Sequence, residues 1–312
     1  MAVIAIDLGG TKSAAAIFNE PGEILFKQAD QLEKRKGKKV AELIIWQINN
    51  LFTKAKENNV TISSIGICVP GIAYTKSGKV WAPNIPEWND YPLVEELQNQ
   101  FQNVEVKIDS DRACYILGEV WKGNAKNCND AIFLAVGTGI GAGILVNHQI
   151  VRGAHDIAGA IGWMGLNKPF DEKYISCGDF EYNASGEGLV KIAKELIASG
   201  KFNESELAKT NSLTAKKVFD AYDNSDVLAK KIIENAIEYW GMAVANLVSL
   251  FNPEKIILGG GIFGPAIKFL DDIYNEAKKW AQPISIQHVQ LVGSALGSDA
   301  GLYGAGYLAL KQ

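Results

Sequence analysis

Side chains that bind soft metals are scarce in this sequence, which has 4 cysteines and 3 histidines among 312 residues. No two cysteines form a Cys-x-x-Cys pair, and their wide spacing resembles no zinc module. The chain is also too long and too poor in cysteine for a disulfide scaffold. These absences argue against a metal site rich in cysteine and histidine.

Long apolar runs and targeting signals are lacking as well. The longest uncharged apolar run, residues 131–146, is shorter than the roughly 18 residues of a membrane-spanning helix, and glycines interrupt it. The N-terminus reaches Asp7 without the basic region of a signal peptide. A net charge of −4 does not favour binding to nucleic acid or to an anionic membrane. We expect a cytoplasmic protein with no nucleic-acid or membrane partner.

Apolar residues are plentiful enough for a large core, at 47% of the chain against 21% charged residues. The length suggests two domains. A strand, a glycine-rich turn and a second strand occur at residues 2–18 and again at residues 131–147. This repeat predicts two similar α/β domains, although two hydrophobic hairpins can also look alike by chance. We place the smaller domain at residues 1–118, joined by a C-terminal helix at about 298–312, and the larger at residues 119–297.

Hydrophobic periodicity and turn residues predict the elements of both domains. Helices are predicted at residues 41–58, 93–101, 113–121, 188–199, 215–222, 227–251 and 298–311. Strands are predicted at residues 2–6, 13–18, 23–27, 62–69, 104–108, 131–136, 144–147, 149–152 and 255–258.

Glycine-rich turns follow three of these strands, at Gly9-Gly10, at Gly137–Gly143 and at Gly259–Gly261. Glycine lets the backbone approach a ligand closely and permits positive φ, so successive N–H groups can form a nest for phosphate oxygens. The hydroxyls of Thr11 and Thr138 would add donors, and the alternative is that these are ordinary tight turns. The sequence has no GxxxxGK[ST] motif, and its one loose dinucleotide fingerprint leads into a strand where a helix is required.

Two carboxylates lie where strands meet turns. Asp7 precedes the first glycine turn, where it can hold Mg²⁺ directly or through water or simply cap the turn. Asp111 follows the strand at 104–108 and begins a predicted helix. It can act as a general base toward an attacking hydroxyl, or it can be the N-cap of that helix. Asp109 is the rival carboxylate.

Seven motifs occur in order along nearly the whole chain: Ile4–Lys12, Val69–Gly71, Ala82–Asn84, Ser110–Glu119, Val136–Gly143, Asn252–Gly261 and Asp299–Ala305. Together they resemble the ROK family of sugar kinases and transcriptional repressors, within the hexokinase/actin-like ATPase fold. The resemblance implies an α/β protein of two ribonuclease H-like domains with an ATP and sugar cleft between them. It also implies a homodimer.

The resemblance assigns roles to individual residues. ATP and phosphate binding is implied for Asp7, Gly9, Gly10, Thr11, Lys12, Thr138, Gly139, Gly260 and Gly261, with Mg²⁺ at Asp7. Sugar binding is implied for Gly71, Asn84, Ser110, Asp111 and Glu181. The resemblance also implies Asp111 as the catalytic base.

The sequence departs from the family at the characteristic Glu-x-Gly-His motif, which falls on Ala160-Ile161-Gly162-Trp163. In the family these two polar residues contact sugar hydroxyls, and the His also helps to hold a zinc ion. The following loop supplies only Cys177, so we predict no structural zinc. Trp163 either stacks on a sugar or fills the space of the zinc loop. His155 either reaches the sugar, as Asp156 beside it also can, or lies at the surface.

The resemblance implies a glucokinase-like enzyme that uses ATP and Mg²⁺ to phosphorylate a hydroxyl, expected to be the 6-OH, of a hexose or hexose derivative. The alternative is a sugar- or nucleotide-binding regulator with impaired catalysis, which the altered sugar motif suggests. The intact Asp7, Asp111 and glycine turns favour the kinase. No helix-turn-helix motif precedes the first strand, which fits the kinase branch better than the repressor branch.

Overall fold

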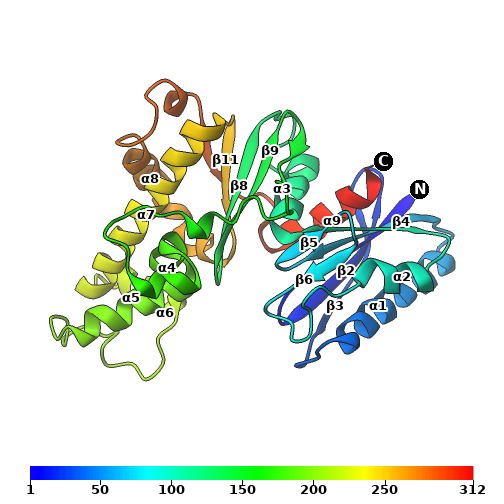
Figure 1. The fold of residues 1–312 in the computed structure, drawn as a ribbon, viewed down its shortest axis with the longest axis horizontal. Helices are drawn as coiled ribbons and strands as arrows, with labels where there is room; N and C mark the ends of the chain where they lie inside the picture. Colours follow the sequence, from blue (N-terminus) through cyan, green and yellow to red (C-terminus); the bar gives the residue numbers. More distant parts are fainter. Residues whose placement is uncertain (312) are drawn as a thin grey trace. The chain divides into compact units, whose positions relative to one another are not determined.

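Two five-stranded sheets organise the chain, one in each unit of the computed structural model, which describes residues 1–311 (Figure 1). Unit 1 comprises residues 1–127, residues 150–158 and the described chain from Ser298 onward. Unit 2 comprises residues 128–149 and 159–297. The chain therefore passes between the units more than once.

The sheet of unit 1 has the strand order β3-β2-β1-β4-β7. Its strands are β1 (Ala2–Leu8), β2 (Lys12–Asn19), β3 (Ile24–Gln31), β4 (Ile62–Val69) and β7 (Glu105–Ser110). The first three strands run antiparallel as a meander, whereas β1, β4 and β7 are parallel. A separate hairpin pairs β5 (Ile72–Tyr74) with β6 (Lys79–Trp81).

Helices cover both faces of this sheet because β1 is apolar on both sides. Its residues Ile4 and Ile6 belong to the core beneath α1 (Lys38–Glu57) and α2 (Leu93–Gln100). The alternate residues Val3 and Ala5 belong to a second core with α3 (Asp111–Lys122) and α9 (Ala300–Leu310). Small residues let α9 pack closely: a Cβ on Gly304 would lie 1.8 Å from the carbonyl oxygen of Cys114.

Unit 2 repeats this topology with the strand order β10-β9-β8-β11-β12. Its strands are β8 (Ala131–Val136), β9 (Ile140–Val146), β10 (Gln149–Ile150), β11 (Lys255–Gly259) and β12 (Gln290–Gly293). As in unit 1, an antiparallel hairpin is extended by parallel strands. The prediction of two similar α/β halves is confirmed at the level of the sheets.

Most helices of unit 2 come between β10 and β11 in the sequence, and α8 comes between β11 and β12. These helices are α4 (Asp179–Ala184), α5 (Gly186–Ala198), α6 (Ala215–Asp223), α7 (Val227–Phe251) and α8 (Leu270–Ala277). Short 3-10 helices are η1 (Ile161–Trp163), η2 (Glu172–Ser176), η3 (Gly261–Phe263), η4 (Pro265–Phe269), η5 (Ser285–Gln287) and η6 (Gly297–Asp299). None of the described helices is long and apolar enough to cross a membrane.

The predicted strand at 62–69 and the predicted helix at 227–251 have the observed bounds. The difference between predicted and observed bounds that matters most for the site lies at the junction of β7 and α3. Strand β7 continues through Ser110, and α3 begins at once with Asp111. The predicted domain division after residue 118 would fall inside α3, which is continuous to Lys122, and unit 1 extends to Asn127 before the chain leaves it.

Candidate functional site

The first glycine turn connects β1 to β2 beside Asp7. Its backbone closes with a hydrogen bond from the N–H of Gly9 to the carbonyl of Lys12, at 2.9 Å. Neither Gly9 nor Gly10 has a positive φ, so the expected conformational reason for glycine does not apply here. A Cβ on Gly10 would instead lie 3.4 Å from the Cβ of Asn84. The turn therefore lies next to a residue of the predicted sugar loop.

Asp7 lies near the end of β1, opposite Cys68 of β4. Burial raises the pKa of its carboxyl to about 6, and the charges of Asp111 and Asp299 add to the shift. A hydrogen bond with Cys68 and the charge of Lys12 act in the opposite direction.

Helix α9 closes the space behind the Asp7 carboxylate. A Cβ on Gly301 would lie 2.8 Å from that carboxylate, so only glycine allows this approach. A single hard carboxylate suits Mg²⁺, which uses one or two protein carboxylates together with substrate phosphates and water. The site therefore fits the ion that the family resemblance implies.

Asp111 is the first residue of α3, and the N-cap is Ser110, whose hydroxyl accepts the N–H of Ala113 at 3.4 Å. The alternative of a capping Asp111 is therefore wrong, because β7 runs two residues further than the sequence pattern suggested. The Oδ1 atom of Asp111 accepts the N–H of Arg112 at 2.8 Å. Among the described residues no donor reaches its Oδ2 atom. Burial raises the pKa of the carboxyl, and the Arg112 charge lowers it.

The rival carboxylate, Asp109, is already engaged. Arg152 donates to its Oδ2 atom from Nη2 at 2.5 Å and from Nε at 3.1 Å, and the N–H of Ser110 donates to Oδ1 at 2.8 Å. With 3% of its side chain exposed, Asp109 anchors residues 150–158 of unit 1. Of these two carboxylates, Asp111 is the one with an oxygen that no described donor reaches.

Arg112 carries an unusual feature for a residue in the first turn of a helix. Its Nε and Nη2 atoms are buried and have no hydrogen-bond partner among the described residues. Buried polar groups are almost always paired, so this guanidinium beside Asp111 has donors that suit an anionic ligand.

The second glycine turn, between β8 and β9, encloses Glu181 of α4. The Oε2 atom of Glu181 accepts the N–H of Ile140 at 2.7 Å. If Gly139 carried a Cβ, that atom would lie 2.6 Å from Oε2 of Glu181, and a Cβ on Gly162 would lie 2.9 Å from the same oxygen. Burial raises the pKa of Glu181, while the Ile140 N–H and the charge of Lys191 lower it. Neither Gly139 nor Gly162 has a positive φ. Glycine is therefore needed at both positions for the close approach of Glu181 and not for its backbone conformation.

A cavity of about 780 Å³ opens beside this turn, within the range of small-molecule sites. Its walls include both glycine turns of unit 2 and one face of α5: Gly137, Thr138, Gly186, Glu187, Val190, Lys191, Lys194, Leu213, Ala215, Gly261 and Ile262. Gly260 has φ +87° and its Cβ would lie 2.5 Å from the Val136 carbonyl, so this turn does require glycine. The predicted phosphate residues of unit 2 thus lie in or beside one cavity.

The residues present do not fit a zinc ion in the segment where the family resemblance implies one. No group of three or more His, Cys, Asp or Glu side chains suited to a metal occurs in the described part of the chain. The buried Cys177 has the ammonium group of Lys191 at 3.7 Å from its sulfur, which disfavours a cation there. Trp163 is 58% exposed and does not fill the interior.

The remaining predicted sugar residues fall in unit 1. Gly71 has φ +86°, and its Cβ would lie 2.2 Å from the carbonyl of Trp81, so the loop after β4 requires glycine. Asn84 and His155 are exposed, and Asp156 next to His155 accepts the hydroxyl of Thr75 at 2.9 Å. No contact joins His155 to Asp111 among the described hydrogen bonds and ion pairs.

The sequence analysis missed several residues beside Asp111 or on the cavity wall: Arg112, Arg152, Glu187, Lys191 and Lys194. The α5 residues share one helix face at spacings of three and four, which was a usable signal. Arg152 gave no signal, because its partner lies 43 positions away.

Comparisons with known proteins agree with this architecture. A model of the ROK family matches residues 3–312. A glucokinase from Halalkalibacterium halodurans is 32% identical over 99% of this chain and 95% of its own length. A xylose repressor from Caldicellulosiruptor bescii is also 32% identical, over 90% of this chain and 71% of the repressor.

Among solved structures, a ROK family glucokinase from Streptomyces griseus in complex with glucose and AMPPNP is 26% identical. It superposes with a TM-score of 0.79, and both chains are covered completely. The fold is accordingly that of the actin/hexokinase-like sugar kinases. With a family model that spans almost every residue, the chain belongs to the ROK family.

Proposed function

We propose that this protein is an ATP-dependent sugar kinase, with Asp111 as its general base. The observation that carries the proposal is the partly buried Asp111 carboxylate at the start of α3, which is held at one oxygen and has no donor to the other among the described residues. The glucokinases among its relatives support the same class of reaction, and one of them binds glucose and AMPPNP. We propose ATP as the phosphoryl donor. We also propose that the protein is located in the cytoplasm.

In the proposed reaction, Oδ2 of Asp111 accepts the proton of a sugar hydroxyl as its oxygen attacks the γ-phosphorus of ATP. The bond from that phosphorus to the β–γ bridging oxygen breaks, and ADP leaves. We propose the 6-OH as the nucleophile, because it is the one primary hydroxyl of a hexopyranose. Asp7 would hold Mg²⁺, which neutralises phosphate charge when bound.

Unit 2 supplies binding groups in this proposal. The cavity beside Gly137, Thr138 and Gly261 is large enough for a nucleotide, and N–H groups of the glycine turns suit its phosphates. The half-buried carboxylate of Glu181 would accept hydroxyl groups of the sugar. A hydrogen bond to a charged group contributes about 1.5–3 kcal/mol. The exposed ring of Trp163 would give the sugar an apolar face in place of the family's Glu and His contacts.

A substrate panel tests the proposed function. ADP release, coupled to a reporter enzyme, is measured with hexoses, amino sugars and N-acylated sugars in the presence of Mg²⁺. We expect ATP-dependent turnover of at least one of them. The xylose repressor among the relatives favours a second candidate, a sugar-binding regulator. Retained sugar or nucleotide binding with no turnover on any sugar would support that candidate and contradict the kinase.

Arg112 is expected to bind oxygens of the transferring phosphoryl group, since its buried Nε and Nη2 atoms have no other partner among the described residues. Arg112→Ala should therefore lower kcat by roughly 10–100-fold, with Arg112→Lys intermediate. Because the Arg112 charge lowers the pKa of Asp111, the acid limb of the pH profile should also move to higher pH in the alanine variant.

Chemical rescue separates this role from a structural one. Millimolar guanidinium ion should restore part of the activity of Arg112→Ala and have no effect on the wild-type enzyme. A folded alanine variant with unchanged kcat would contradict the assignment.

A further inference from the structure

One buried carboxylate, that of Asp179, ties the chain after η1 to the start of α4. Its side chain belongs to a residue only 6% exposed. The Oδ2 atom accepts the N–H of Leu166 at 2.8 Å and the N–H of Asn167 at 3.0 Å. A carboxylate removed from water is costly unless its oxygens are paired, so these bonds fix the backbone at residues 166–167.

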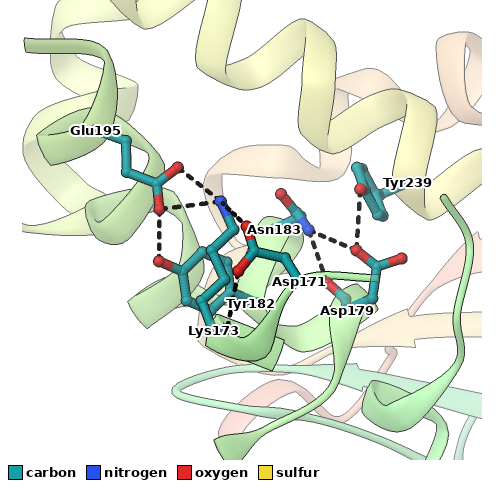
Figure 2. Close-up of polar contacts among 7 residues, drawn as sticks. All are labelled: Asp171, Lys173, Asp179, Tyr182, Asn183, Glu195 and Tyr239. Atoms are coloured by element: carbon teal, nitrogen blue, oxygen red, sulfur yellow. Dashed lines mark hydrogen bonds and ion pairs between the residues drawn. The ribbon is translucent and has the colours of Figure 1, made fainter. Parts of the chain in front are cut away.

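The other oxygen connects the same residue to the core of unit 2 (Figure 2). The Oδ1 atom of Asp179 accepts the amide of Asn183 at 2.8 Å and the hydroxyl of Tyr239 at 3.1 Å. Asn183 lies one turn further along α4, and Tyr239 comes from the long helix α7; both are buried. Four donors occupy the lone-pair positions of the two carboxylate oxygens, which leaves none for a metal ion.

The segment that Asp179 holds forms one wall around Glu181. A Cβ on Gly162 would lie 2.9 Å from the Oε2 atom of Glu181 and 3.0 Å from the carbonyl of Ile140. Gly178, with φ +85°, packs so closely that its Cβ would meet the Gly162 carbonyl at 2.4 Å. Glu181 is thus clamped between the β8–β9 turn and residues 161–163, and displacement of this segment would move its carboxylate.

We propose that Asp179 is a positioning residue for sugar binding, which holds residues 161–167 against α4 through hydrogen bonds in place of the zinc ion that the family resemblance implies. The proposal rests on the proposed function, because it acts through Glu181 as a sugar contact. It also agrees with the position of the Lys191 ammonium group beside the sulfur of Cys177, which disfavours a metal ion at that cysteine.

Steady-state kinetics of matched variants test the proposal. Asp179→Ala should raise the KM for the sugar about tenfold, as expected for a residue that orients a ligand-binding group, and leave the KM for ATP within about twofold. Glu195→Gln is the control, because Glu195 belongs to an exposed cluster in the same region with Lys173 and Tyr182 (Figure 2). It should leave both constants unchanged.

A double variant shows whether Asp179 acts through Glu181. The KM for the sugar of Asp179→Ala/Glu181→Ala should equal that of Glu181→Ala alone, because residues acting as one unit are not additive. Multiplicative effects of the two substitutions would overturn the proposal. Tyr239→Phe removes one of the four donors and should give a smaller rise in the same direction, which provides a test if Asp179→Ala does not fold.

Hydrogen exchange gives a readout independent of catalysis. The amides of Leu166 and Asn167 should exchange at least tenfold faster in Asp179→Ala than in the wild type or in Glu195→Gln. If the wild type phosphorylates no sugar, the proposed function fails, and the exchange rates still decide whether Asp179 holds the segment. Unchanged exchange, or stoichiometric zinc in the purified wild type by elemental analysis, would overturn the proposal.

Discussion

Asp111→Ala is expected to lower kcat by about 10²–10⁴-fold, the usual contribution of a general base, while the protein stays folded. The Oδ1 atom of Asp111 is held by the N–H of Arg112 and no described donor reaches Oδ2, so the carboxylate is oriented and has room for a proton. The rival Asp109 cannot replace it, because Arg152 and the N–H of Ser110 occupy both of its oxygens. The measurement is coupled ADP release at saturating sugar and ATP.

The isosteric Asp111→Asn keeps an oxygen for the Arg112 N–H but cannot accept the proton, and we expect the same loss of turnover. Binding of ATP and of the sugar, measured by calorimetry, should change by less than the turnover does. Asp90→Asn is the matched control, since Asp90 is an exposed carboxylate of unit 1 paired with Lys79. Turnover of Asp111→Asn close to that of the control would show that another group is the base.

The pH profile gives an independent check on the same residue. A base works only when ionised, so kcat/KM should fall as the pH drops through the pKa of Asp111. Burial raises that pKa above the ordinary 3.8 of an aspartate, and the acid limb should therefore lie at higher pH than for an exposed carboxyl. A rate that is unchanged down to pH 4 would contradict the assignment.

The fold was largely predictable because its signals are local. Apolar runs with glycine turns identified the hairpins of both sheets, and the helical period of residues 227–251 identified α7 over its full length. The end of β7 lies two residues beyond its predicted end, because Asp109 and Ser110 are polar and yet are buried in the strand. A polar pair at a strand end looks like a turn until its partners are known.

Without the family resemblance, which also pointed to Glu181, the candidate site was predictable only where chemistry follows a strand end. Asp7 and Asp111 could be found because carboxylates at the ends of parallel strands point to ligand binding. Asp179 could not be, because its four donors come from a backbone segment, its own helix and α7. The reason given for glycine at residues 9, 10, 137 and 139 was also incomplete. Their φ values are not positive, and at Gly139 it is the approach of Glu181 that excludes a side chain.

Asp7→Asn is expected to stabilise unit 1 by about 3 kcal/mol above pH 7 and to abolish most of the kinase activity. Burial raises the pKa of Asp7 from 3.8 to about 6, and each pKa unit corresponds to about 1.36 kcal/mol. The folded state therefore binds the proton more tightly than the unfolded state does. Between pH 3.8 and about 6 the stability of the wild type falls as the pH rises, and above this window the full cost of the buried charge is present.

Asparagine carries no charge at any pH, so the variant lacks this dependence. Its advantage should be largest above pH 7, clearly smaller at pH 4.5, and absent only well below pH 3.8, where Asp7 is protonated in both states. Urea unfolding, followed at pH 8 and at pH 4.5 in the presence of EDTA, measures the difference without Mg²⁺ bound to the wild type. Equal gains at both pH values, or no gain at pH 8, would contradict the raised pKa.

The loss of activity has the same origin as the gain in stability. The charge that destabilises Asp7 in the folded protein is the charge that would hold Mg²⁺ beside the phosphates, and α9 approaches it closely only because Gly301 has no side chain. Adding Mg²⁺ should therefore raise the stability of the wild type and not that of Asp7→Asn, since a ligand stabilises only the state that binds it. Equal stabilisation of both proteins by Mg²⁺ would place the ion elsewhere.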